Sequence, residues 1–248
     1  MPHAIVRIRA LDINVTPLNA SEVVGKIRTH AINKLGLRIG NFNLHAAYLY
    51  HTNEDFARYC DDCDVLLIDG WPIWLHAKLS SPKVRGVECR IGSSDWLAYL
   101  LETTTDPISI VAIGGTPEAS SQAAINIQRN YPAVSWLGFD GYSSKDRVEE
   151  RLADAIADAD LILVGMGMPL QEEWIERNHE LLRDKVVANV GGCIDYFAGT
   201  QKHAPRWMGK LGVEWLFRLA ASPRRLWHRY TVEPFYLLLV LLRKQLTK

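Results

Sequence analysis

The sequence has few cysteines, no net charge and no long apolar run, and each shortage excludes a class of protein. Four cysteines in 248 residues are too sparse for a disulfide framework, and no signal peptide precedes them. Cations and anions balance at 28 each, which removes the basic field of a nucleic-acid binder. The longest apolar stretch, Pro234–Leu242, is shorter than the ~20 residues that cross a bilayer. We expect a cytoplasmic protein without a membrane span or nucleic-acid partner.

Several ligand-binding motifs are also missing. Neither G-x-G-x-x-G after the first predicted strand nor G-x-x-x-x-G-K-[ST] occurs, which disfavours hydride transfer and P-loop chemistry. The eight histidines form no ligand pair, and His45 is the one in a notable position. Cys60 and Cys63 form a C-x-x-C before a strand, where a structural role is favoured over redox or zinc roles.

Two D-x-D patterns resemble the metal sites of many sugar transferases. Asp62-Cys63-Asp64 and Asp158-Ala159-Asp160 both lie at the entrance of a predicted strand. Chemistry in parallel sheets gathers at the opposite edge, beyond the carboxyl ends of the strands. We therefore expect no obligatory metal and no cofactor.

Short Ile- and Val-rich runs alternate with stretches of helical period. Runs such as Val65–Ile68 are apolar without alternation, which is typical of strands covered on both faces. The pattern predicts an α/β fold: a Rossmann-like, mostly parallel sheet covered by helices (residues 1–200), followed by a C-terminal helical, membrane-proximal appendage (201–248). The predicted strands are Ile5–Val15, Leu37–Asn43, Val65–Ile68, Ile108–Ile113, Ser135–Phe139, Leu161–Gly165 and Val186–Val190, and the predicted helices are Ala20–Lys34, Ile73–Leu79, Asp95–Glu102, Pro117–Asn130, Lys145–Asp158 and Gln171–Leu182.

Glycines and polar residues follow most of the predicted strands. Glycine there permits close backbone approach to a ligand, and Thr116-Pro117 is typical of an N-cap and first helical position whose free amides suit a phosphate. The candidates at these strand ends are Asn41, Asn43, Asp69, Gly114, Gly115, Gly167, Gln171 and Asp195.

Two of these positions have structural alternatives. Asp69 either caps the helix that starts near Pro72 or deprotonates an acceptor hydroxyl. Glu172 is expected to begin a helix and complement its dipole, whereas Gln171 either does the same or meets a sugar hydroxyl or phosphate oxygen.

The C-terminal segment interleaves cations with large apolar residues. One interpretation is a helix pair packed on the domain with a solvated basic face. The favoured one is an interfacial element, with Leu237–Leu242 in the lipid headgroup region and arginines on phosphates. The protein is then peripheral to the inner face of the cell membrane.

These residues, in this order, resemble the WecG/TagA/CpsF family, glycosyltransferase family 26. The resemblance runs from Asn41 to about Phe235, and Asn41–Ala46 looks like the opening motif of its xanthan-type exopolysaccharide glucosyltransferase branch. The other matching segments are Asp69-Gly70, Arg90-Ile91 through Asp95-Trp96, Gly114-Gly115-x-Pro117, Tyr131-Pro132, Gly141-Tyr142, Gly165 through Glu172, Asp195 with Gly199, Ala204-Pro205-x-Trp207 and Glu214 through Arg218.

The resemblance implies inverting, metal-independent transfer from a UDP-sugar to a polyprenyl-diphosphate-linked saccharide. Glucose, N-acetylmannosamine and its uronic acid are the expected donor sugars. Asp69 would be the base. By position, the donor sugar and diphosphate would be lined by Asn43, Arg90 and Gln171, and the nucleoside would contact Tyr142 and Asp195. The appendage would contribute guanidiniums that stabilise the leaving diphosphate, from Arg218, Arg225 and Arg229.

The chain departs from the family pattern in its cations. His203 precedes Ala204-Pro205 where a cation is expected, and His228 is the second basic residue beside Arg229. Arg85 is a possible substitute in the diphosphate site. Two other functions stay open, a non-catalytic membrane-associated assembly protein and a nucleotide-dependent oxidoreductase, and a homo-oligomer is possible.

Overall fold

The computed structural model describes residues 4–84, 86–142, 150–202, 204–205, 208–209 and 212–246. A six-stranded sheet in the order β4-β3-β8-β7-β5-β6 forms its centre, and every neighbouring pair is parallel. The predicted α/β fold with a mostly parallel sheet is thereby confirmed. The strands are β3 (Leu37–Phe42), β4 (Val65–Ile68), β5 (Ile108–Gly114), β6 (Val134–Phe139), β7 (Leu161–Gly165) and β8 (Val186–Asn189).

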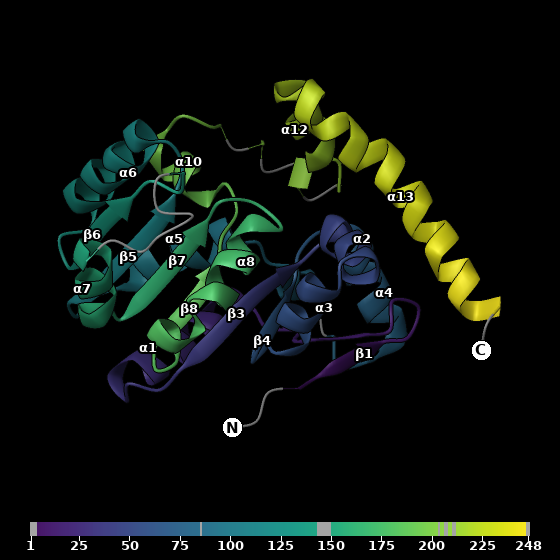
Figure 1. Cartoon of the computed structure of the whole chain (residues 1–248), viewed down its shortest axis with the longest axis horizontal. Coiled ribbons are helices and arrows are strands. Elements are labelled where there is room, and N and C mark those ends of the chain that lie inside the picture. Colours follow the sequence, from purple (N-terminus) through teal and green to yellow (C-terminus); the bar gives the residue numbers. More distant parts are fainter. Residues whose placement is uncertain are drawn as a thin grey trace.

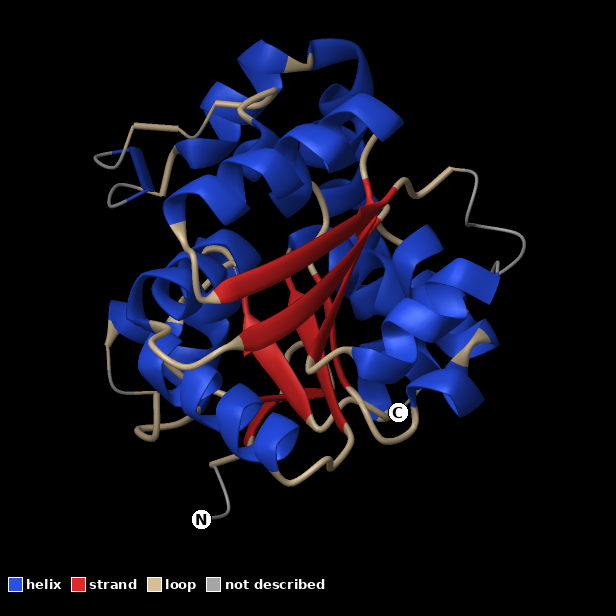
Figure 2. Ribbon diagram, turned by 90° about the vertical axis from the view of Figure 1, so that its left-hand side faces the viewer, coloured by secondary structure: helices blue, strands red, loops and turns tan. Residues whose placement is uncertain are grey.

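Helices cover both faces of this sheet (Figure 2). Successive strand residues face opposite sides, so Ile110 and Ala112 join one apolar core while Val111 and Ile113 join the other. One face carries α1 (Ala20–Ile32), α5 (Ser93–Thr103), α6 (Pro117–Asn130) and α10 (Cys193–Ala198). The other carries α2 (Leu44–Thr52), α3 (Glu54–Asp61), α4 (Trp71–Ser80), α7 (Glu150–Asp158), α8 (Leu170–Arg177) and α9 (His179–Leu182).

The prediction of one strand over Ile5–Val15 is wrong. β1 (Val6–Ile8) and β2 (Ile13–Val15) form an antiparallel hairpin outside the main sheet. The turn between them places Asp12 at φ 53°, and its carboxylate accepts a hydrogen bond from Arg7 at 2.7 Å. The Thr16 amide then donates to Leu66 O at 2.8 Å, which ties the hairpin to the edge strand β4.

Helices α2 and α3 were not predicted. Asn43 and Asn53 cap them by accepting hydrogen bonds from the amides of Ala46 (3.1 Å) and Phe56 (3.0 Å). The α2 segment shows no clear helical period because neighbouring helices cover it on more than one side. The predicted helix Gln171–Leu182 is divided at Asn178 into α8 and α9, and the first residues of predicted Lys145–Asp158 lie outside the described residues.

The C-terminal segment forms α12 (Glu214–Ala221) and α13 (Pro223–Leu246). Figure 1 shows α13, in yellow, running alongside α2 with its end far from the sheet. Leu226, Glu233 and Leu237 are buried against the core, whereas Trp227 and Phe235 are exposed. None of the described helices is both long enough and apolar enough to cross a membrane.

The junction of β5 and β7 gives a stability prediction. Gly114 has φ 153°, and a Cβ there would lie 2.2 Å from the carbonyl oxygen of Gly165. Gly114→Ala is therefore expected to lower the free energy of unfolding by at least about 2 kcal/mol. A Cβ at Gly25, inside α1, would have nothing within 4 Å, so Gly25→Ala is expected to raise it by about 1 kcal/mol. Urea denaturation measures both, and equal stabilities of the two variants would contradict this account.

Candidate active site

Two adjoining cavities lie at the carboxyl edge of the sheet. From β5 the chain continues to β6 on one side, and from β7 it continues to β8 on the other side. The edge between β5 and β7 is therefore a topological switch point, where ligands bind in such sheets. The glycine cavity (about 670 Å³) is lined by Gly115, Tyr142, Glu172 and Asp195, among others. The Asp69 cavity (about 520 Å³) lies toward α13. Both are lined by Tyr142, Met166, Gly167, Gly191 and Gly192.

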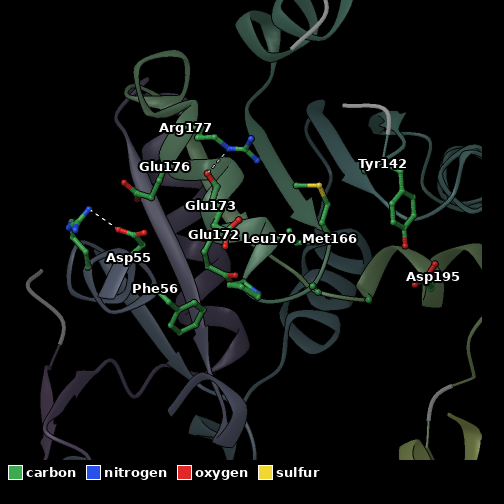
Figure 3. A pocket seen from close by; sticks show the side chains of 18 residues that line it. Asp55, Phe56, Tyr142, Met166, Leu170, Glu172, Glu173, Glu176, Arg177 and Asp195 are labelled. Atoms are coloured by element: carbon green, nitrogen blue, oxygen red, sulfur yellow. Dashed lines mark hydrogen bonds and ion pairs between the residues drawn. The ribbon is translucent and has the colours of Figure 1, made fainter. Parts of the chain in front are cut away.

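The sequence-predicted residues divide between these cavities. The Asp69 cavity is lined by Asn41, Asn43, Asp69, Gly167, Gln171, Arg218 and Arg229. The glycine cavity is lined by Gly115, Tyr142, Gly167 and Asp195, and Figure 3 shows Tyr142 and Asp195 together at one of its ends.

The Asp69 carboxylate does not cap a helix. Helix α4 begins at Trp71 with Gly70 as its N-cap at φ 87°, and no side chain makes a cap hydrogen bond there. Two other hydrogen bonds position Asp69: its backbone N–H donates to Phe42 O at 2.9 Å, and its carboxylate Oδ2 accepts from Asn43 Nδ2 at 3.2 Å. The capping alternative is wrong, and the carboxylate lines the cavity.

Asn43 connects this carboxylate to the C-terminal helix. Its Oδ1 caps α2 through the Ala46 amide and also accepts a hydrogen bond from Arg229 Nη2 at 3.4 Å. These two donors fix the orientation of the amide, so its nitrogen faces Asp69. Arg229 of α13 is therefore linked to Asp69, the candidate base, through hydrogen bonds to the Asn43 side chain.

Two arginines of the appendage line the Asp69 cavity. Arg218 donates from Nε and Nη2 to Glu214 Oε1 at 3.0 and 2.6 Å. Burial lowers the pKa of the Arg229 guanidinium, and the nearby carboxylates of Asp69 and Glu233 oppose this effect. Positive charge thus gathers beside Asp69. Arg225 lies in α13, but its side chain is outside the described ones, as are residues Arg85 and His203.

The strand-end glycines adopt conformations that other residues rarely reach. Gly115, Gly167 and Gly191 have φ values of 71°, 80° and 54°. Thr116 caps α6 by accepting from the Ala119 amide at 3.2 Å, which confirms the predicted N-cap. The backbone of these turns can therefore approach an anionic ligand closely.

Four predicted residues make close contacts with the protein itself. Arg90 lines neither cavity; its guanidinium lies 5.3 Å from the Trp71 ring centroid, and its Nη2 donates to Gly209 O at 3.4 Å. Gly114 packs against Gly165. Gln171 and Asn41 are buried in the lining of the Asp69 cavity. Both ends of the Gln171 amide are hydrogen bonded, whereas Asn41 donates from Nδ2 to Asn189 O and its Oδ1 has no partner in the described part of the chain.

Two important residues of the Asp69 cavity were not predicted as site residues. His45 Nδ1 lies 2.5 Å from the buried carboxylate Oε2 of Glu233, which joins α2 to α13. Burial and the Arg229 charge lower the pKa of His45, so the imidazole is neutral near pH 7. Glu233 is the only acid within Pro223–Leu246, and that isolation was the available sequence signal.

Glu172 lies in the first turn of α8, as expected, but not at the surface. It is buried, and its Oε1 accepts hydrogen bonds from Gln171 Nε2 (2.7 Å) and Asn189 Nδ2 (2.5 Å). Its Oε2 has no hydrogen-bond partner in the described part of the chain. Burial raises the pKa of this carboxyl to about 7.

This pKa predicts how stability changes with pH. A carboxyl with a raised pKa in the folded state stabilises the protein below its unfolded pKa, and that stability is lost as pH rises toward 7. Glu172→Gln cannot ionise, so its stability relative to the wild type should improve by about 3 kcal/mol between pH 4 and pH 8. Urea denaturation across this range measures the difference, and parallel pH profiles would contradict it.

The D-x-D patterns lie at the amino ends of strands, as predicted, and Cys60 and Cys63 precede β4. Asp64 Oδ2 accepts from the Arg38 amide and Asp160 Oδ2 from the Ser109 amide, both at 2.8 Å, at the amino ends of strands. Burial raises the pKa of the Cys60 and Cys63 thiols far above their usual value, which disfavours reactive thiolates.

Comparison with known proteins gives consistent matches. The model of the "Glycosyl transferase WecG/TagA/CpsF family" matches residues 8–248. An N-acetylglucosaminyldiphosphoundecaprenol N-acetyl-beta-D-mannosaminyltransferase of Bacillus subtilis is 28% identical over 226 residues, which cover 90% of this chain and 86% of the relative. An enzyme of the same name from Bacillus spizizenii is 28% identical over 76% of this chain and 72% of its own. Another, from Staphylococcus aureus, is 35% identical over 47% of this chain and 46% of its own.

Proposed function

The chain belongs to the WecG/TagA/CpsF family of glycosyltransferases, and we propose that it moves a sugar, with inversion, from a UDP-sugar to a polyprenyl-diphosphate-linked saccharide. The observation that carries this proposal is the Asp69 carboxylate, which lines a cavity together with Arg218 and Arg229 instead of capping α4. The names of the relatives support the acceptor class, because each denotes transfer to a diphosphoundecaprenol-linked sugar.

The proposed reaction is a single displacement. Asp69 takes the proton of an acceptor hydroxyl while the hydroxyl oxygen forms a bond to the anomeric carbon of the donor. The bond from that carbon to the diphosphate breaks, and UDP leaves with the bonding electron pair. Arg218 and Arg229 neutralise the negative charge that grows on the departing diphosphate.

The donor nucleotide is proposed to occupy the glycine cavity. The exposed Tyr142 ring and Asp195 are suited to the nucleoside, and the turns at Gly115 and Gly167 allow the diphosphate to approach the backbone. Asn43 then faces the donor sugar, while Arg90 and Gln171 act by holding the surrounding backbone. Because arginines supply the positive charge, the proposed mechanism uses no metal and no cofactor.

A donor screen tests this function. Purified protein with a synthetic N-acetylglucosaminyl-diphosphate-prenol is expected to release UDP from one UDP-sugar. The relatives' names favour UDP-N-acetylmannosamine over UDP-glucose, the donor that the xanthan-type branch would use. The absence of UDP release with every donor, including the uronic acid, would overturn the proposal.

We further propose that the exposed side of α13 rests on the inner face of the cell membrane. Trp227, Phe235, Tyr236, Leu238, Leu239 and Leu242 are all exposed on this helix. Such side chains, with cations at both helix ends, suit the lipid headgroup region.

Vesicle binding gives the corresponding prediction. Replacing Leu238 and Leu239 together by Glu is expected to weaken sedimentation with anionic vesicles at least about tenfold, because two leucines leave the lipid and two negative charges are added. Ile32→Glu, at an exposed position on α1, is the control and should bind as the wild type does. Equal binding of the double variant would contradict the membrane assignment.

A further inference from the structure

A network of buried polar side chains reaches both cavities, with Glu172 lining the glycine cavity and Gln171 and Asn189 lining the Asp69 cavity. Glu172 Oε1 accepts hydrogen bonds from Gln171 Nε2 and Asn189 Nδ2. Asn189 Oδ1 in turn accepts from the backbone N–H of Asn41 at 3.0 Å. At the other end, Gln171 Oε1 accepts from the Gly191 amide at 3.0 Å. The network therefore begins on β3 and ends at a turn that lines both cavities.

Glu172 is the only carboxylate in this network, and two amide donors meet at its Oε1. A buried donor that loses its acceptor is strongly unfavourable. If the carboxylate were removed, Gln171 and Asn189 would have to turn their amides toward other partners. Gln171 could then no longer hold the Gly191 amide, and the turn at Gly191, with φ 54°, would lose its support.

We propose that Glu172 is a positioning residue for sugar transfer, which fixes the Gly191–Gly192 turn through Gln171 and Asn189. This inference rests on the proposed function, since the donor diphosphate would cross this turn between the two cavities. Although Glu172 lines the glycine cavity, its carboxylate is turned into the protein: Oε1 accepts two amide hydrogen bonds and Oε2 is fully buried, so it acts through these amides and not by contact with the substrate. Figure 3 shows it between Met166 and the α3 side of the glycine cavity.

The protonation state of Glu172 adds a measurable consequence. Burial favours the neutral carboxyl, and no cation is ion-paired with it in the described part of the chain. Above about pH 7 the ionised group would place a negative charge beneath the diphosphate. The titratable groups around it are Tyr59, Cys60 and Cys63 from the α3 side and Glu173 on its own helix. Arg38 on β3 lies over Tyr59 and is paired with Glu176. The other charged side chains that line the glycine cavity are Asp55, Arg58, Arg177 and Asp195.

The test compares Glu172→Ala and Glu172→Gln with Glu102→Gln, an exposed control on α5. Glu172→Ala is expected to raise the donor KM roughly tenfold with a smaller change in kcat. Glu172→Gln retains an acceptor oxygen and should restore the donor KM at pH 6. The wild-type donor KM should rise roughly tenfold between pH 6 and pH 8.5, and that of Glu172→Gln should stay flat.

Hydrogen exchange at the Gly191 amide provides a readout that does not depend on turnover. Exchange should speed up at least about tenfold in Glu172→Ala and stay at the wild-type rate in Glu172→Gln. Unchanged exchange in Glu172→Ala, or identical pH profiles of donor KM in the wild type and Glu172→Gln, would overturn the positioning role. If Glu172→Ala fails to fold, the pH dependence of the donor KM in Glu172→Gln, compared with the wild type, tests the positioning role. If the wild type releases no UDP from any donor, the proposed function fails while Gly191 exchange still decides the role of Glu172.

Discussion

Replacing Asp69 by Asn is expected to lower kcat for sugar transfer by about 10³-fold, because the amide cannot accept the proton of the acceptor hydroxyl. The change is nearly isosteric. The amide oxygen of the variant side chain can still accept the hydrogen bond from Asn43 Nδ2, so the fold and the donor KM should be retained. UDP release under saturating donor and acceptor measures kcat, and thermal unfolding checks the fold.

Asp158→Asn is the matched control for this prediction. Asp158 is an exposed carboxylate at the end of α7, near the amino edge of the sheet. The same chemical change there should leave kcat within about twofold of the wild type. Turnover of Asp69→Asn at the wild-type rate would show that another group takes the proton, and His45, neutral near pH 7 in the same cavity, would be the next to substitute.

Arg229→Met is expected to lower kcat/KM by about 10²-fold, since a preorganised donor to developing charge is removed. Arg229 lines the Asp69 cavity and reaches Asn43 from α13. Methionine retains the apolar part of the side chain, so α13 should stay docked through Leu226, Glu233 and Leu237. Lysine at this position should recover only part of the activity, because it cannot replace the planar guanidinium.

Two controls separate this effect from membrane binding. Arg224→Met removes an exposed cation of the same helix and should leave turnover in detergent unchanged. Vesicle binding of Arg229→Met should stay close to that of the wild type, because one partly buried cation contributes little to the membrane contact. An equal loss of turnover in both variants would indicate that α13 contributes general charge and that Arg229 has no specific place in the site.

The positions of most site residues were predictable from the sequence, but the hydrogen-bond partners of their side chains were not. The strand ends, and hence Asp69, Gly115 and Asp195, were predictable because parallel strands deliver their carboxyl ends to one edge. Arg90 and Gln171 were at the predicted places in the chain, yet their side chains bond to protein groups. The Glu233–His45 pair joins residues 188 positions apart, and no local pattern contains such a contact.

The helices next to the site show the same limit. The sequence pattern missed α2 because that helix is covered by other elements and therefore lacks a single apolar face. Likewise, Ile5–Val15 was predicted as one strand because its apolar alternation continues through a turn that only pairing of β1 with β2 reveals.

Local patterns in the chain were enough to predict the α/β architecture, the family and the strand-end glycines and carboxylate, because apolar periodicity and turn chemistry involve only near neighbours. It took the packed molecule to show that Asp69 lines a cavity instead of capping α4, that α13 brings Arg229 and Glu233 to α2, and that Glu172 is buried at the glycine cavity. These features depend on which distant side chains meet and on what is removed from water, and neither can be read from a short stretch of residues.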